Sequence, residues 1–168
     1  MQDLSFRTLL VKFFTLMLLI IIFTGCEAFQ YAEGNKCLEN GDFENAVILL
    51  SKAEKVCPQV SKLQNQLANA YLGCGNIEQA WYHSQLAVLF EDPDRDAWVT
   101  FLNLYEICVV KKGLLQKGTL IEDVLCQLGD PNLREEGKDM IGLLYGRLVM
   151  QFQDSKLINH FFSMLPGE

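Results

Sequence analysis

The sequence predicts an all-α fold, a short solenoid of helix–turn–helix pairs in about three or four units that follows an N-terminal signal or anchor helix. Two observations carry this prediction. A pattern of small and polar residues recurs at a fixed offset of 34 positions, and an uncharged run of 11 residues stands near the N-terminus. Internal repeats with a period between roughly 20 and 50 residues are typical of solenoids.

The N-terminal segment has the composition of an export signal. Residues 1–12 carry Arg7 and Lys12, and residues 13–23 contain no charge. A bilayer span needs about 20 apolar residues, so this run is too short unless the helix starts near Leu9. A basic start, a short apolar stretch and small residues at its end are typical of a signal peptide. We therefore predict a signal peptide over residues 1–25.

Residues 23–26 read Phe-Thr-Gly-Cys. This stretch resembles the lipobox of bacterial lipoprotein signal peptides, in which Thr24 and Gly25 match and Phe23 stands where leucine is usual. The resemblance implies that Cys26 receives a diacylglycerol, that the chain is cut before it and that the new amine is acylated. Two or three acyl chains hold a protein firmly to a bilayer, whereas one gives marginal binding.

The mature chain would then be residues 26–168, lipid-anchored to the cell membrane or the outer membrane and facing the periplasm or the outside. Two alternatives stay open for the same segment. It could be an uncleaved signal anchor followed by an ordinary Cys26, or a buried helix.

Residues 33–58 align with residues 67–92 at the offset of 34. Small residues at fixed places let two antiparallel helices approach closely, and a turn glycine adopts backbone angles that other residues resist. Asp42 and Asn76 follow these glycines, where an N-cap is wanted for the second helix. The aligned pairs are Gly41 with Gly75, Glu44 with Glu78, Ala46 with Ala80, and Ala53 with Ala87.

This pattern resembles the tetratricopeptide repeat, which implies a right-handed solenoid over residues 26–168. The predicted units are residues 27–60 and 61–94, followed by two degenerate units over 95–134 and 135–168. In the third unit, a longer turn over residues 109–118 precedes a helix that starts at Thr119. We expect Thr119 and Glu122 to form its capping box. Its apolar face comprises Ile121, Val124, Leu125 and Leu128.

The fourth unit is predicted to be another helix pair. Residues 141–145 read Ile-Gly-Leu-Leu-Tyr and match the Leu-Gly-x-x-Tyr core of the repeat motif. Apolar residues at helical spacing place one helix near residues 133–148 and a second from about Ser155. Asp154 stands where the motif has alanine, which indicates a longer turn or a divergent terminal unit.

In tetratricopeptide arrays, the first helix of each pair lines a groove that accepts an extended peptide or a partner's helix. The resemblance places Asn35, Asn69 and Asn103 at one groove-facing position of three successive units. An amide both donates and accepts hydrogen bonds, which suits the backbone of a bound segment. The alternative is that a polar residue happens to recur on an exposed helix face. The further groove candidates are Tyr31, Lys62 and Asn65.

The sequence contains no recognisable catalytic or metal-binding motif. His83 and His160 are far apart and belong to no HExxH-like pattern. The net charge of −7 disfavours nucleic acid as a partner, because phosphates require a basic surface. Five cysteines would remain after lipidation, without a C-x-x-C pair, and a bridge between Cys37 and Cys74 is conceivable. We therefore expect no enzymatic activity, no metal and no cofactor other than the acyl chains on Cys26.

The leading hypothesis is a non-enzymatic envelope lipoprotein whose repeat groove binds a protein partner, as a scaffold or an assembly factor of a membrane-associated complex. The alternative is an uncleaved, membrane-anchored structural subunit that packs onto a larger complex. An envelope enzyme with a cryptic site ranks third. The leading hypothesis rests on architecture alone, a lipobox followed by repeats, and function does not follow from fold.

Overall fold

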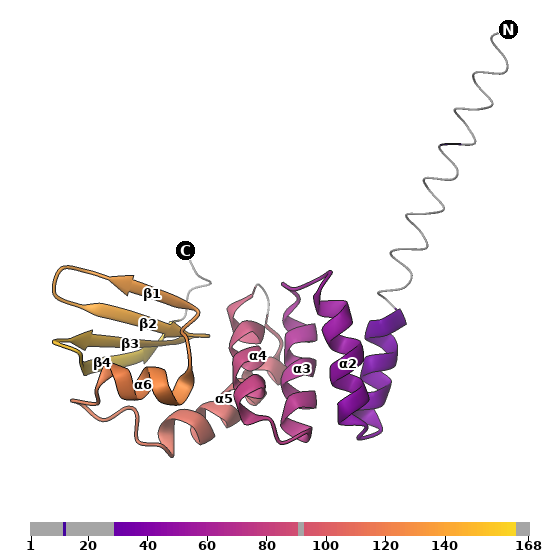
Figure 1. Ribbon diagram of the computed structural model, residues 1–168, viewed down its shortest axis with the longest axis horizontal. Helices are drawn as coiled ribbons and strands as arrows, with labels where there is room; N and C mark the ends of the chain where they lie inside the picture. The colour runs from indigo at the N-terminus through magenta and orange to yellow at the C-terminus, as the bar shows by residue number, and fades with distance from the viewer. Residues whose placement is uncertain (1–11, 13–28, 91–92, 164–168) are drawn as a thin grey trace, which may run out of the picture.

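The computed structural model describes Lys12 and residues 29–90 and 93–163. Its helices lie side by side in a row, and a small sheet closes the row at the end away from the helix of residues 29–39 (Figure 1). The predicted lipidation site, Cys26, and the predicted signal peptide lie outside the described residues, apart from Lys12.

The first two helix pairs are present as predicted. Residues 29–39 pair with α2 (Phe43–Glu54), and α3 (Ser61–Gly73) pairs with α4 (Ile77–Leu89). Gly41 and Gly75 form the two turns with φ of +76° and +75°. The side chains of Asp42 and Asn76 accept hydrogen bonds from the backbone amides three residues later, at 3.4 and 3.1 Å. The predicted turn glycines and N-caps are thereby confirmed.

The small residues of the repeat lie where neighbouring helices meet. Ala46, Ala80 and Ala87 are fully buried, and Ala53 is nearly so. Gly34 packs so closely on α2 that an added Cβ would lie 2.8 Å from the Leu50 side chain. The close approach of the helices thus depends on a methyl group at the four alanines and on a glycine at position 34, where a methyl group has no space.

The first helix of the third unit extends slightly further than predicted. Asp94 is the N-cap of helix α5 (Arg95–Tyr105), and its carboxylate accepts a hydrogen bond from the Ala97 amide at 2.8 Å. Helix α5 packs against α3 and α4. It continues directly into η1 (Glu106–Val110), a turn of π-helix that includes residues 109 and 110, which the sequence predicts to start a longer turn.

The predicted second helix of the third unit exists, but its predicted capping box is wrong. Helix α6 (Ile121–Leu128) buries Ile121, Val124 and Leu128 as predicted, and Gly129 ends it with φ of +78°. Leu120 precedes the helix without a side-chain cap, and the Thr119 hydroxyl instead donates to the Gln116 carbonyl. In Figure 1, α6 lies against the sheet.

The prediction of an all-α fold is wrong, because residues 133–162 form a four-stranded antiparallel sheet. The strands are β1 (Leu133–Glu136), β2 (Ile141–Tyr145), β3 (Leu148–Gln153) and β4 (Lys156–Phe162), and each pairs with the next in the order β1-β2-β3-β4. The Leu-Gly-x-x-Tyr match over residues 141–145 is therefore strand β2. The helix expected from Ser155 is strand β4.

The period of burial explains why this segment is a sheet. In β3, Leu148, Met150 and Phe152 are buried, and the residues between them are partly exposed. This alternation is typical of a strand with one face on a core. Asp154 and Ser155, with φ of +50° and +60°, make the two-residue turn between β3 and β4. Positive φ at both positions is the backbone of a type I′ hairpin, whose twist matches that of the strands.

The turn between β2 and β3 fixes the sheet to the helices. The Arg147 side chain is buried, and its Nε donates to the Val88 carbonyl of α4 at 2.7 Å. Gly146 has φ of +62°, and an added Cβ would lie 2.9 Å from the Phe101 ring. The ring of Phe162 also contacts those of Phe101 and Tyr105. One apolar cluster therefore runs from α4 and α5 through α6 into the sheet.

The tight contact at Gly146 predicts a specific loss of stability. Gly146→Ala adds a methyl group that has no space against Phe101 and Val88, whereas Gly75→Ala imposes a similar positive-φ strain in open space. Overpacking a core costs about 1–3 kcal/mol. We expect urea unfolding to show a free energy of unfolding lower for Gly146→Ala than for Gly75→Ala by that amount. Equal decreases in the free energy of unfolding for the two variants would show that Gly146 has space for a methyl group beside Phe101 and Val88.

Candidate functional site

The structure places Asn35, Asn69 and Asn103 in three different environments. The Asn35 Oδ1 atom is buried and has no hydrogen-bond partner. Asn69, on α3, is half-buried, and Asn103, on α5, is exposed. The Asn35 carbonyl oxygen is therefore closed to a partner, whereas Asn69 and Asn103 keep part of their surface accessible.

Asn69 makes two long hydrogen bonds, one within α3 and one to α5. Its Nδ2 donates to Asn65 Oδ1 at 3.5 Å, and its Oδ1 accepts from the Thr100 hydroxyl at 3.5 Å. Both distances exceed the usual range of about 2.7–3.2 Å for strong hydrogen bonds. The Asn69 amide could therefore form shorter bonds to an added peptide group at little cost.

The other predicted groove residues differ in accessibility. Lys62 is exposed on α3, whereas Asn65 is only 5% exposed and lies beneath Asn69. Tyr31 packs against the apolar cluster around Leu50, so much of its surface is covered. Lys62 thus remains available for a surface contact, and Asn65 and Tyr31 have structural contacts of their own.

Sequence reasoning missed three residues beside the two accessible amides. Gln66 and Thr100 occupy the same repeat position, 34 residues apart, and Ile107 follows Asn103 by one helical turn. Gln66 Oε1 is buried without a partner, and Ile107 is 40% exposed. The repeat register could have revealed the first two, but the exposure of Ile107 depends on where the array ends. We name the set of Lys62, Gln66, Asn69, Thr100, Asn103 and Ile107 the amide surface.

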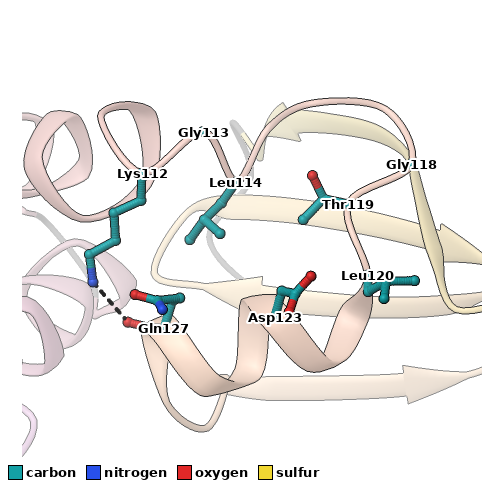
Figure 2. Close-up of a pocket in the computed structure, with 8 residues that line it drawn as sticks. All are labelled: Lys112, Gly113, Leu114, Gly118, Thr119, Leu120, Asp123 and Gln127. Carbon is teal, nitrogen blue, oxygen red and sulfur yellow. Dashed lines mark hydrogen bonds between the residues drawn. The ribbon is translucent and has the colours of Figure 1, made fainter.

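A cavity of about 550 Å³ lies between α6 and the loop before it. Figure 2 shows Lys112 reaching toward α6, where its ammonium donates to the Gln127 carbonyl at 3.3 Å. Asp123 lines the same cavity. A smaller cavity of about 390 Å³ shares Lys112 and Gln127 and is lined by Trp81 and Cys108. Neither combination forms a nucleophile–base pair of the kind used in covalent catalysis.

The described residues contain no cluster of three or more His, Cys, Asp or Glu side chains that could hold a metal ion. Cysteines 37, 57, 74, 108 and 126 are free, so Cys37 and Cys74 are not bridged. The described part of the chain also contains no helix long and apolar enough to cross a membrane.

His83 belongs to a buried polar cluster between the two helix pairs. Its Nδ1 lies 2.7 Å from Gln64 Oε1 and 3.6 Å from Glu54 Oε1, and Gln64 Nε2 donates to Glu54 at 2.9 Å. The ring also stacks on Tyr71 and meets the edge of Tyr82. Burial lowers the pKa of His83, and the Glu54 carboxylate partly opposes this effect.

Comparison with protein-family models and with curated proteins finds no match for this chain. The candidate site is therefore defined by its geometry alone.

The buried His83 predicts a pH dependence of stability. Because its pKa in the folded chain is below the ordinary 6.5, the unfolded chain binds the proton more readily. The stability that neutral His83 contributes is complete above pH 6.5 and falls as the pH drops from there toward the lowered pKa. We expect thermal unfolding to show a smaller loss on acidification for His83→Gln than for the wild type.

The exposed His160 provides the matched control. His160→Gln should follow the wild-type profile. A His83→Gln profile identical to that of the wild type would show that this imidazole does not carry the effect.

Proposed function

We propose that this chain is a non-enzymatic, lipid-anchored envelope protein whose amide surface binds a segment of a partner protein, as a scaffold or assembly factor. The observation that carries the proposal is the combination of Asn69 and Asn103 with the exposed Ile107. The two amide groups can form hydrogen bonds to a peptide backbone. The apolar Ile107 side chain beside them can pack against an apolar side chain of the partner.

The hydrogen-bonding state of Asn69 supports this proposal. A hydrogen bond between two protein groups that replaces their bonds to water contributes a net free energy of about 1 kcal/mol. A long intramolecular hydrogen bond contributes less. A bound backbone that offers an N–H and a C=O to Asn69 would replace its two 3.5 Å contacts by shorter ones. Asn103 would offer the next such pair along the bound segment.

The anchor rests on the lipobox resemblance of residues 23–26. The stretch of apolar residues before Cys26 would deliver the chain to the membrane and then be removed. The repeat array would remain at the surface, held by the acyl chains, and would present the amide surface to a partner in the same compartment.

The structural-subunit alternative has one observation in its favour. Phe161 and Phe162, at the end of β4, are 44% and 37% exposed. Large aromatic side chains that remain exposed at the end of a sheet can pack against another protein. In that alternative, contact through these two residues would replace binding at the amide surface.

A pull-down with variants of the amide surface tests the proposal. Asn69→Ala and Asn103→Ala should each weaken capture of the partner by about fivefold, the effect of one lost hydrogen bond near 1 kcal/mol. Ile107→Ser should weaken it similarly, and Ile48→Ser, at a comparably exposed isoleucine of α2, should not. Circular dichroism should show unchanged helix content in all four.

Binding that survives all three changes and is lost only in Phe161→Ser or Phe162→Ser would reject the amide surface and favour the structural subunit.

The lipid anchor predicts a defined mass for the protein extracted from membranes. The wild type should have the mass of residues 26–168 plus acyl chains, and Cys26→Ala should lack the acyl mass. Intact-mass spectrometry distinguishes the two. A full-length, unlipidated chain in both samples would mean a signal anchor or a buried helix.

A further inference from the structure

Helix α5 carries a stripe of exposed side chains on the face opposite its buried residues. The buried side is made by Ala97, Phe101 and Leu104. The stripe comprises Arg95, Val99 and Leu102 of α5 and Glu106, the first residue of the continuous η1 turn, at spacings of four, three and four residues. Such spacing places side chains in one line along a helix, as in the seam of a coiled coil.

Two large apolar residues at the centre of this stripe have no cover within the described residues. Val99 is 48% exposed and Leu102 is 46% exposed. Arg95 and Glu106 flank them and are also exposed. These two charges lie roughly 16 Å apart along the helix axis, at 1.5 Å per residue, so they cannot pair with one another. Neither forms an ion pair with another described residue.

The stripe is symmetric about its own midpoint. Val99 and Leu102 are centred between Thr100 and Phe101, and so are Arg95 and Glu106. A twofold axis through this point would place a second α5 antiparallel to the first. Arg95 of each copy would then face Glu106 of the other, and Val99 would face Leu102. In a twofold interface each contact occurs twice, so both charges of both copies would be paired.

We propose that a second copy of this chain binds along this stripe, with the two α5 helices antiparallel. Charge complementarity selects this occupant. When the stripe is placed beside a reversed copy of itself, each basic end faces an acidic end and the apolar residues face each other. Parallel packing would oppose Arg95 to Arg95 and Glu106 to Glu106. The antiparallel arrangement therefore also fixes the direction of the second helix.

This interface is separate from the amide surface. Asn103 and Ile107 lie on the flank of α5 that adjoins α3, since Thr100 on that flank contacts Asn69. The stripe lies roughly a quarter of a turn away from that flank, at 3.6 residues per turn. The two surfaces share no residue, so a substitution in one leaves the residues of the other unchanged.

The contact should be weak. A standard stable interface buries about 800 Å² per partner, and one helix stripe with two apolar residues offers less. We therefore expect a dimer that depends on protein concentration and that forms more readily between copies held on one membrane, where the effective concentration is raised.

Sedimentation equilibrium of the full chain in density-matched detergent tests the proposal with charge reversals. Arg95→Glu would place carboxylates opposite Glu106 twice per dimer, and Glu106→Arg would place two guanidinium groups together twice. Each single variant should dimerise at least about tenfold more weakly than the wild type, equivalent to about 1.4 kcal/mol. An equimolar mixture of the two variants should regain the wild-type affinity, because each mixed dimer restores both opposite-charge pairs.

The restored mixture is the decisive result, since a structural effect of either substitution would persist in the mixture. Circular dichroism should show that both variants keep the helix content of the wild type. A wild type that stays monomeric over about a hundredfold range of concentration would overturn the proposal. Single variants that associate like the wild type, or a mixture that does not recover, would also overturn it.

Discussion

The contact between the β2–β3 turn and helices α4 and α5 is the interaction on which the rest of the structure depends. Arg147 is buried there and donates from Nε to the carbonyl of Val88. Without this hydrogen bond, a buried charged group would be left with an unmet donor, which is costly. Gly146 permits the approach, because any side chain at its position would meet Phe101. The sheet is held to the helices by a contact with little tolerance.

This contact also joins the sheet to the last helices of the row. Helix α6 and the sheet share one apolar cluster with α4 and α5. The face of α5 opposite its buried residues is left exposed. Both surfaces proposed for binding, the amide surface and the stripe of Arg95, Val99, Leu102 and Glu106, involve α5 for this reason.

The helical half of the fold could be predicted because its signals are local and repeated. Gly41 and Gly75 recur at the repeat period, as do the caps Asp42 and Asn76, and each acts within a few residues of its own position. The sheet was missed because residues 141–145 satisfy a helical motif taken by themselves. The correct signal was the alternation through residues 148–152, together with the two-residue turn at Asp154 and Ser155.

The candidate site was predictable only in part, for a similar reason. The repeat register identifies Asn69 and Asn103, but it does not show that Asn65 lies beneath Asn69 or that Tyr31 packs into a core. Those outcomes depend on contacts between helices that are distant in sequence, such as the bond from Thr100 to Asn69. The exposure of Ile107 and Leu102 depends on which other elements pack against α5 and η1, and the sequence pattern does not show this.

Hydrogen exchange measured by mass spectrometry tests most directly whether the sheet and the helical array form one cooperative unit. If they form one unit, peptides from β2 and β3 exchange with the same free energy of opening as peptides from α4 and α5. Arg147→Ala should then lower the protection of both regions together. Strand peptides that exchange well before the α4 and α5 peptides, with helix protection unchanged in Arg147→Ala, would show that the sheet opens independently of the helices.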